Sequence, residues 1–269
     1  MDRTNRIKSE LSRNNVVCGC MVAEVRTPAV SMILESAGLD FFIIDMEHGS
    51  FSYETANDII VSCRGLNIVP FVRVPGIQRE SFQKMLDAGA QGLLIPRIET
   101  AEQVEQAMKL IRYAPMGSRG ISLRRAHSGF GRPEPVQFTT WANSNVMLMV
   151  QIETKLGVEN IDTISDVEGI DVLFVGPSDL AHSYGNGDAA QVESAIERVV
   201  QVGKAKAIAT GIHHSSLPYI NRLIGDGMRF FSVNTEVGAM IRTFSEMTTA
   251  IRSGTGTDTR QMGNRPETP

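Results

Sequence analysis

The chain alternates between short apolar runs and longer stretches in which apolar residues recur every three or four positions. Short apolar runs are typical of buried strands, and the longer spacing is typical of helices that pack one face on a core. We predict eight strands, at 16–22, 41–46, 69–74, 92–98, 147–153, 172–177, 205–212 and 230–236. Strands that are separated by helices in this way run parallel in one sheet.

Helical stretches with recognisable ends lie between the predicted strands. We expect helices at 28–37, 52–64, 79–87, 100–112, 155–166, 189–203, 217–225 and 238–251. Thr100 and Gln103 have the spacing of a capping box, in which each side chain accepts a hydrogen bond from the main chain of the other residue. Several of these helices end at a glycine, among them Gly38, Gly65 and Gly89, as helix C-termini often do.

Eight parallel strands with a helix after each fit either an open doubly wound sheet or a closed (β/α)8 TIM barrel. The count of eight favours closure, and no predicted strand runs into a GxGxxG turn or a GxxxxGK[ST] loop. We therefore predict an α/β fold in which residues 1–254 form a single TIM barrel domain with an N-terminal helix. Residues 255–269 are polar and lack apolar periodicity, so we expect a mobile tail there.

Composition and charge exclude several classes of partner. The 269 residues carry a net charge of -4, which offers no basic surface for nucleic acid. No run approaches the ~20 apolar residues that a membrane crossing needs, and the polar first 15 residues do not resemble a secretion signal. Three cysteines, Cys18, Cys20 and Cys63, are too few and too irregularly spaced for a disulfide framework. We expect a cytoplasmic protein with buried thiols and a small-molecule partner.

Catalytic groups of TIM barrels lie at the carboxyl ends of the strands, and the strand ends of this chain are rich in acids. The polar residues there are Asp45, Glu47, His48, Arg73, Arg97, Gln151, Glu153, Asp179, His213, His214, Asn234, Thr235 and Glu236. Glu153 and Asp179 each follow an apolar run on neighbouring strands, so the two carboxylates could share one metal ion. Gln151 lies on the same strand face as Glu153 because side chains alternate with a period of two.

Two ways of stabilising a carbanion next to a carbonyl remain at this point. A Schiff-base enzyme needs a desolvated lysine in the barrel mouth, and the only lysines near the strand ends are Lys155 and Lys206. Lys206 is near the start of a predicted strand and therefore at the wrong rim. A metal enzyme needs hard oxygen ligands, and Mg²⁺ or Mn²⁺ takes one or two carboxylates while keeping water or substrate. Glu153 and Asp179 favour the metal alternative.

Six ordered motifs resemble the HpcH/HpaI class II aldolases, which are metal-dependent pyruvate aldolases acting on 4-hydroxy-2-oxo acids. The motifs are IIDMEHGSFS at 43–52, FVRVPG at 71–76, MLDAGAQGLLIPRIET at 85–100, YAPMGSRG at 113–120, VQIET at 150–154 and VEGIDVLFVGPSDLA at 167–181. The resemblance covers residues 16–251 and implies reversible cleavage to pyruvate and an aldehyde, through an enolate stabilised by a divalent metal. It implies Glu153 and Asp179 as ligands of Mg²⁺, Mn²⁺ or Co²⁺.

The same resemblance implies roles for further residues. Arg73 would lie beside the keto oxygen as a fixed positive charge, and the turn of Gly176, Pro177 and Ser178 would bind the pyruvate carboxylate. Gln151 is expected among the substrate ligands. His48 would handle protons, since imidazole exchanges them near neutral pH, and Asp45 would orient it.

Asp87 would reach the site of a neighbouring protomer. The resembled family forms hexamers in which C-terminal helices pack on neighbours, and Met240, Ile241, Phe244, Met247 and Ile251 are compatible with that assembly or with covering the barrel's own flank.

Other interpretations of these residues stay open. Asp45 and Glu47 could be surface or capping residues, and Arg73 could form a structural salt bridge. His213 and His214 are adjacent, so at most one of them faces the site. His127 fits a loop residue better than a catalyst, and the role of the 119–132 segment is open.

Alternative functions remain as well. A relative acting on an acyl-CoA ester would need a basic rim, for which Arg124 and Arg125 are the obvious candidates. Decarboxylation of oxaloacetate through the same enolate is another possibility, and a non-catalytic barrel that binds an oxo acid is a third.

Overall fold

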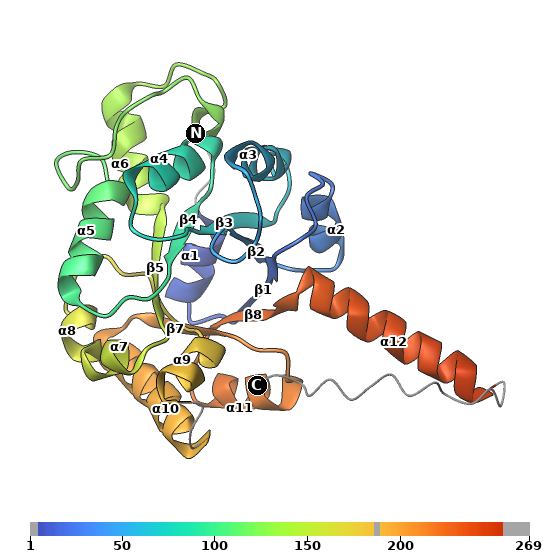
Figure 1. The fold of residues 1–269 in the computed structure, drawn as a ribbon. Helices are drawn as coiled ribbons and strands as arrows, with labels where there is room; N and C mark the ends of the chain where they lie inside the picture. Colours follow the sequence, from blue (N-terminus) through green and yellow to red (C-terminus); the bar gives the residue numbers. More distant parts are fainter. Residues whose placement is uncertain (1–4, 186–188, 255–269) are drawn as a thin grey trace.

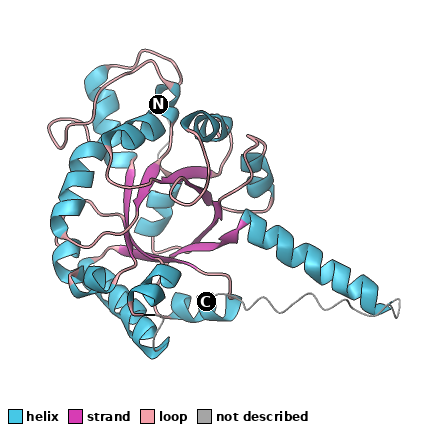
Figure 2. Cartoon of the chain, viewed as in Figure 1, coloured by secondary structure: helices cyan, strands magenta, loops and turns pink. Residues whose placement is uncertain are grey.

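The structure is a computed structural model that describes residues 5–185 and 189–254. Eight parallel strands pair in sequence order and close into a barrel, with β1 hydrogen-bonded to β8 (Figure 1). Helices surround the strands on the outside (Figure 2). The predicted TIM barrel is therefore confirmed.

The strands are β1 (Val17–Val22), β2 (Phe41–Asp45), β3 (Val69–Arg73), β4 (Gly92–Ile95), β5 (Met147–Ile152), β6 (Val172–Val175), β7 (Ala209–His213) and β8 (Phe230–Thr235). The helices are α1 (Arg6–Ser12), α2 (Val30–Ser36), α3 (Tyr53–Ser62), α4 (Arg79–Ala88), α5 (Ala101–Ile111), α6 (Pro135–Asn145), α7 (Lys155–Glu159), α8 (Ile161–Ser165), α9 (Pro177–Ser183), α10 (Ala189–Lys206), α11 (Leu217–Gly225) and α12 (Glu236–Gly254). A short 3₁₀ turn, η1, spans Ala126–Ser128.

Aromatic rings fill the interior of the barrel. Phe41, Phe71, Phe174 and Phe230 point inward from four strands, and the rings of Phe41 and Phe230 stack with centroids 4.1 Å apart. Glycine makes room for these rings, because a Cβ at Gly19 would lie 2.4 Å from the Phe41 ring. Offset aromatic pairs add to the energy of area burial, so this packing forms a rigid apolar floor.

The two ends of the barrel differ. At the amino-terminal end, α1 contributes Ile7, which is fully buried with the interior side chains of the strands. At the carboxyl-terminal end, the inward positions that follow the phenylalanine floor are polar, including Asp45 on β2, Arg73 on β3 and Gln151 on β5. The alternation of side chains along each strand thus carries charged groups to one end only.

The helix boundaries agree with the sequence where a cap is present. Thr100 and Gln103 form both hydrogen bonds of the predicted capping box at the start of α5. The predicted strand at 205–212 begins later, at Ala209, because α10 continues to Lys206 before Ala207 takes a positive φ of 55°. The sequence hides this boundary, because alanine recurs on both sides of it and no glycine or proline marks the turn at Ala207.

Two further differences concern helices. The predicted helix at 155–166 is divided into α7 and α8 at Asn160, whose side chain donates a hydrogen bond to the carbonyl of Glu99. Helix α6 was not predicted, because only Phe138 and Ala142 along it are buried and the apolar periodicity is weak. The strand predicted to end at Pro177 ends at Val175, and Pro177 instead opens α9.

Helix α12 extends away from the barrel (Figure 1). Its first residue, Glu236, is buried and accepts hydrogen bonds from the main-chain N–H groups of Ala23, Glu24 and Val25, which tie the end of β8 to the end of β1. No helix within residues 5–185 and 189–254 is long and apolar enough to span a membrane. The mobile tail predicted at 255–269 lies outside the described residues.

Replacing Gly19 by alanine should destabilise the barrel. The added Cβ would meet both the ring and the carbonyl oxygen of Phe41, and overpacking of this kind lowers the free energy of unfolding by about 2 kcal/mol. Urea unfolding measures the change. Gly225→Ala is the matched control, because nothing lies within 4 Å of a Cβ there and alanine suits a helix. Equal unfolding midpoints for the two variants would contradict the packing argument.

Candidate active site

The carboxyl ends of β2, β3 and β5 bring one arginine and several acids together. Asp45 and Arg73 are opposite each other in the β2–β3 register, and both are buried. Arg73 Nε donates to Asp45 Oδ1 at 2.9 Å and Nη2 donates to Oδ2 at 2.7 Å, a bidentate pair. Arg73 Nη1 lies 3.2 Å from Glu47 Oε2. The guanidinium is therefore fixed as a positive charge at the barrel end.

Glu153 is held by the main chain and not by a cationic side chain. It is 1% exposed, and its Oε1 accepts a hydrogen bond of 2.8 Å from the N–H of Arg97, a residue in the left-handed region with φ of 53°. Its Oε2 accepts from Gln151 Nε2. Gly176, which follows β6 and precedes α9, makes this arrangement possible, since a Cβ there would lie 2.4 Å from Glu153 Oε2.

The acids at this end repel one another. Burial, together with the charges of Glu47 and Asp179, raises the pKa of Glu153 to about 7, although the Arg97 N–H and the Arg73 charge act in the opposite direction. Burial also raises the pKa of Glu47, against the charges of Arg73 and His48. Burial alone would raise the pKa of Asp45, but its hydrogen bonds and ion pair with Arg73 lower it. The net effect is unbalanced negative charge around Glu153.

The donor set suits a hard divalent cation. Glu153 and Asp179 supply carboxylate oxygens, and Asp179 has no ion-pair partner among the residues the structure describes. The Oε1 atom of Gln151 is buried without a hydrogen-bond partner. Within the same residues, no group of three or more His, Cys, Asp or Glu is arranged as a complete metal site. Two protein carboxylates suit Mg²⁺ or Mn²⁺, because these ions fill the rest of their coordination shell with oxygens of water or substrate.

His48 and Asp45 are not arranged as the sequence interpretation expected. Both Asp45 oxygens bind Arg73, and Oδ1 also accepts from the main-chain N–H groups of Glu47 and His48 at 3.0 and 3.3 Å. Asp45 thus orients the backbone of this loop and not the imidazole. The His48 side chain is 67% exposed, and its Nε2 lies 3.9 Å from Glu47 Oε2.

The two adjacent histidines face opposite sides, as their alternation requires. His213 Nδ1 lies 2.9 Å from Ser232 Oγ inside the barrel, and burial with the nearby charge of Arg73 lowers its pKa to about 4. His214 instead stacks on Tyr219, with ring centroids 4.4 Å apart. A neutral His213 beside a fixed arginine can accept or donate one hydrogen bond but carries no charge at neutral pH.

Asp87 lies away from this group in its own chain. It is in the last turn of α4, and a helix that follows a barrel strand ends near the amino-terminal rim. Its Oδ1 accepts from Arg119 Nη2 at 2.8 Å, and its main-chain carbonyl lies 3.0 Å from His127 Nδ1. A contribution from Asp87 to this end of the barrel would have to come from another copy.

The two lysines considered from the sequence both lie on the outside. Lys155 Nζ is 3.8 Å from Glu159 on an exposed face of α7, and Lys206 pairs with Asp166 at the end of α10. Neither contact involves the acids at the barrel end. This geometry disfavours a Schiff base formed by either lysine.

A model of the HpcH/HpaI aldolase/citrate lyase family matches residues 21–243. The chain belongs to this family. Two curated relatives are named 5-keto-4-deoxy-D-glucarate aldolase. The one from Escherichia fergusonii is 34% identical over 237 residues, covering 87% of this chain and 91% of the relative. The one from Salmonella paratyphi C is 33% identical over 238 residues, covering 87% and 92%.

Solved structures of the HpcH/HpaI family share the barrel. An HpcH/HpaI aldolase from Desulfitobacterium hafniense is 26% identical with a TM-score of 0.87, covering 91% of this chain and 96% of that one. A family protein from Burkholderia cenocepacia is 30% identical with a TM-score of 0.86, covering 93% and 100%. The structure of citrate synthase SbnG is 28% identical with a TM-score of 0.81, covering 92% and 98%.

Two groups at the active end of this HpcH/HpaI protein carry little signal in the sequence: the Glu47 carboxylate and the main-chain N–H of Arg97. Glu47 could be taken for a capping residue, yet it turns inward to Arg73 and its charge acts on Glu153. Arg97 contributes through its main-chain N–H, for which no side-chain signal exists. The spacing of two residues from Asp45 would place Glu47 on the same face of a strand. Glu47 lies in the loop after β2, however, so the direction of its side chain depends on that loop.

Replacing Glu153 by glutamine should stabilise the metal-free protein at high pH. Because the folded pKa of about 7 exceeds the ordinary value of 4.5, the wild-type free energy of unfolding falls as pH rises from about 4.5 to 7, by up to roughly 3 kcal/mol. Glu153→Gln avoids this loss. Urea unfolding in a chelator should show the variant more stable at pH 8 and the two proteins converging near pH 4.5.

Glu168→Gln, which changes an exposed acid, is the control for this comparison. Its free energy of unfolding should follow the wild-type pH dependence throughout. A parallel pH dependence of wild type and Glu153→Gln would show that Glu153 is not a strained, buried carboxylate.

Proposed function

We propose that this HpcH/HpaI family member, a carbon–carbon lyase, is a divalent-metal-dependent aldolase that reversibly cleaves a 4-hydroxy-2-oxo acid into pyruvate and an aldehyde. The observation that carries the proposal is the carboxylate of Glu153, whose pKa is raised by burial and by the charges of Glu47 and Asp179, and which forms no ion pair with a cationic side chain among the residues described. Glu153 and Asp179 would hold Mg²⁺, Mn²⁺ or Co²⁺. When bound, such an ion polarises a keto oxygen and so eases breakage of the neighbouring carbon–carbon bond.

Arg73 is suited to hold the keto-acid end of the substrate. Its Nε and Nη2 are bound by Asp45 and its Nη1 lies near Glu47, so the guanidinium keeps one orientation. A preorganised positive charge stabilises negative charge that develops on an oxygen during cleavage without any reorganisation at that moment. Asp45 therefore acts by positioning Arg73.

The turn after β6 and the amide of Gln151 are proposed to position pyruvate. Gly176 leaves space beside Glu153 that any side chain would fill, and Pro177 and Ser178 follow in the first turn of α9. The unpaired Oε1 of Gln151 can accept a hydrogen bond from a water or a hydroxyl. These groups would hold the carboxylate end of the substrate close to the acids.

His48 is proposed to take the proton from the 4-hydroxyl group. Its exposed side chain at the barrel end can reach a bound substrate, and Glu47 Oε2 at 3.9 Å is near enough to attract the imidazolium that proton uptake forms. The hydrogen bonds from the Glu47 and His48 main chain to Asp45 limit how far this loop can move.

The substrate class follows from the chemistry of the name shared by the curated relatives. Numbered from its keto end, 5-keto-4-deoxy-D-glucarate is a 4-hydroxy-2-oxo acid, and cleavage next to its hydroxyl-bearing carbon yields pyruvate and a three-carbon aldehyde acid. We therefore place this compound first in a substrate panel. The aldehyde half would meet the ends of β1 and β7, where Arg26 is exposed.

Purified enzyme with Mg²⁺ or Mn²⁺ should release pyruvate from members of this panel, and a chelator should stop the release. Glu153→Ala and Asp179→Ala should lower kcat/KM on the order of 10³-fold, because each removes a ligand of the ion that polarises the substrate. Coupled spectrophotometric detection of pyruvate measures the rates. Glu105→Ala, an exposed acid on α5, should retain wild-type activity.

Outcomes that contradict the proposal are distinct. A lysine adduct trapped by borohydride with pyruvate would replace the metal mechanism by a Schiff base. A folded, metal-loaded protein that is inert on every hydroxy-oxo acid would favour a binding role. Turnover of oxaloacetate alone, or of an acyl-CoA ester alone, would assign the site to those reactions. The likeness to citrate synthase SbnG is the reason to include them in the panel.

We also propose that α12 packs against a second copy of the chain. Five large apolar side chains along it are 45–65% exposed, which is unusual for a helix of 19 residues, about 28 Å long. They are Met240, Ile241, Phe244, Met247 and Ile251. Burial of this stripe by a neighbour would give a homo-oligomer, and the family resemblance suggests a hexamer in which Asp87 reaches a neighbouring site.

The double variant Ile241→Glu/Phe244→Glu should therefore dissociate, as light scattering after gel filtration would measure. The two introduced carboxylates would lose their hydration in an apolar interface without gaining hydrogen bonds or ion pairs, so association would become unfavourable. Thr249→Glu, an exposed position on the opposite face of the same helix, is the control and should keep the wild-type mass. A monomeric wild-type protein, or a double variant of unchanged mass, would contradict the proposed interface.

A further inference from the structure

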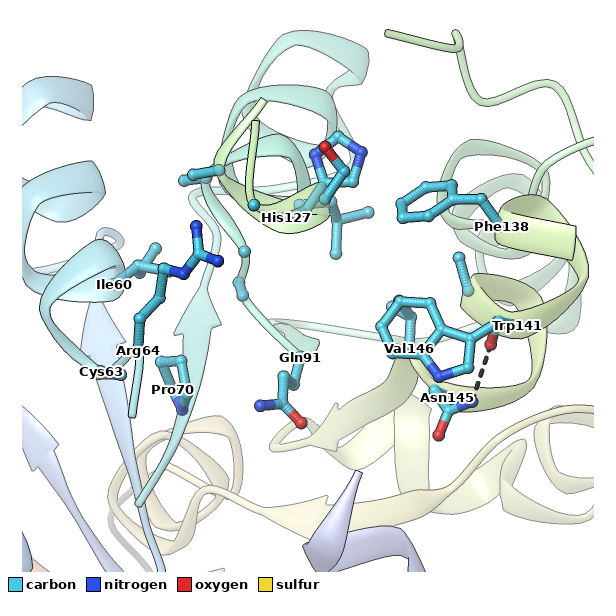
Figure 3. A pocket seen from close by; sticks show the side chains of 18 of the residues that line it. Ile60, Cys63, Arg64, Pro70, Gln91, His127, Phe138, Trp141, Asn145 and Val146 are labelled. Carbon is cyan, nitrogen blue, oxygen red and sulfur yellow. Dashed lines mark hydrogen bonds between the residues drawn. The ribbon is translucent and has the colours of Figure 1, made fainter. Parts of the chain in front are cut away.

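A cavity of about 360 Å³ lies at the amino-terminal end of the barrel, opposite the acids described above (Figure 3). Pro70, Gln91 and Val146, at the amino-terminal starts of β3, β4 and β5, line its base. Segments of α3, α4, η1 and α6 form its walls. Its volume lies within the range of about 300–1,000 Å³ that is usual for small-molecule sites.

One wall of the cavity is aromatic. Phe138 and Trp141 on α6 face the space, with ring centroids 5.8 Å apart (Figure 3). Leu86 and Cys63 add apolar surface from α4 and the end of α3. A planar apolar body would be desolvated well between these groups.

His127 presents an unsatisfied nitrogen to the cavity. Its side chain is 7% exposed, it lines the cavity, and its Nε2 is buried without a hydrogen-bond partner. Because Nδ1 lies 3.0 Å from the carbonyl of Asp87, Nδ1 must carry the proton and Nε2 must be an acceptor in the neutral ring. Burial lowers the pKa of His127, which favours the neutral ring. A ligand hydroxyl would satisfy this acceptor.

Positive charge accompanies this acceptor. The guanidinium of Arg64 points into the cavity, and it has no ion-pair partner among the described residues (Figure 3). Gly129, with φ of 69°, allows this approach, because a Cβ there would lie 2.5 Å from Arg64 Nη2. Arg119, whose side chain is 2% exposed, also lines the cavity, and its Nε is buried without a partner. No Asp or Glu is among the lining residues.

We propose that this cavity binds a small planar hydroxycarboxylate. The carboxylate pairs with Arg64, as guanidinium groups bind carboxylates in a bidentate way. The planar body lies beside Phe138 and Trp141, and the hydroxyl donates to His127 Nε2. The residues that line the cavity are not those of the proposed metal site of the same chain, so binding here can be measured without turnover.

Trp141 is the single tryptophan of the chain and reports on the cavity directly. Titration of the full-length protein with 4-hydroxybenzoate should give a saturable change in tryptophan fluorescence. Arg64→Met should weaken the binding at least about tenfold, the loss expected for one charge-assisted pair. Arg132→Met is the matched control, because Arg132 is an exposed arginine in the loop between η1 and α6 that does not line the cavity, and this variant should bind as the wild type does.

Two further titrations test the individual contacts. Wild type should bind 4-hydroxybenzoate more tightly than benzoate, and His127→Phe should abolish that difference while still binding benzoate. Equal affinities of the wild type for benzoate and 4-hydroxybenzoate would overturn the role of His127. If inorganic phosphate bound as tightly as 4-hydroxybenzoate, the site would recognise an anion without a planar body, and the proposed role of Phe138 and Trp141 would be wrong.

The proposal as a whole fails if no probe changes the fluorescence of Trp141 at concentrations up to about 10 mM, where even weak specific binding is detectable. It fails equally if Arg64→Met, with an unchanged circular dichroism spectrum, binds 4-hydroxybenzoate as the wild type does.

Discussion

The site at the carboxyl end of the barrel depends on one buried carboxylate that has no cationic ion-pair partner within residues 5–185 and 189–254. Glu153 is buried beside main chain, an amide and other acids, so its ionised form is disfavoured and its pKa is raised to about 7. Burying an ionised group without a partner is unfavourable, and natural proteins retain such an arrangement where a ligand completes it. Arg73 is not the ion-pair partner of Glu153, because the guanidinium is hydrogen-bonded to Asp45 and lies beside Glu47. The geometry thus separates a fixed positive charge from a set of acids available to a metal.

The apolar interior makes this arrangement rigid. Four phenylalanines close the barrel below the polar end, and glycines opposite them leave space for the rings. Such a densely packed floor resists relaxation, so the acids cannot move apart to reduce their repulsion. Gly176, nearer the carboxyl end of the barrel, also leaves space, because the side chain it lacks would overlap the Glu153 carboxylate. The unfavourable free energy of holding these acids together is offset by apolar burial elsewhere in the barrel.

The opposite end of the barrel carries a different chemistry. There the buried polar atoms without a hydrogen-bond partner include Nε of Arg119 and Nε2 of His127, and one wall of the cavity is aromatic. Arg119 and His127 line the cavity and also contact Asp87, the residue that the family resemblance directs toward a neighbouring copy. The segment between α5 and α6, whose role was open from the sequence, therefore lies between a cavity and an acid with a proposed role in assembly. The exposed stripe lies on α12, a separate element that extends away from the barrel after β8 (Figure 1).

The sequence by itself determined the eight strands, the parallel alternation and the positions of lone acids at strand ends, because hydrophobic periodicity and strand ends are local properties. It also determined that Gln151 and Glu153 share a face and that His213 and His214 do not. Only the tertiary structure decided the partners: Asp45 binds Arg73 and not the imidazole of His48, Glu47 turns inward, and the Arg97 N–H supports Glu153. Periodicity specifies the side on which a residue lies, whereas its partner depends on loops and on residues distant along the chain. For the same reason, two features became visible only in the folded barrel: helix α6, which buries two residues, and the start of β7, which no glycine or proline marks.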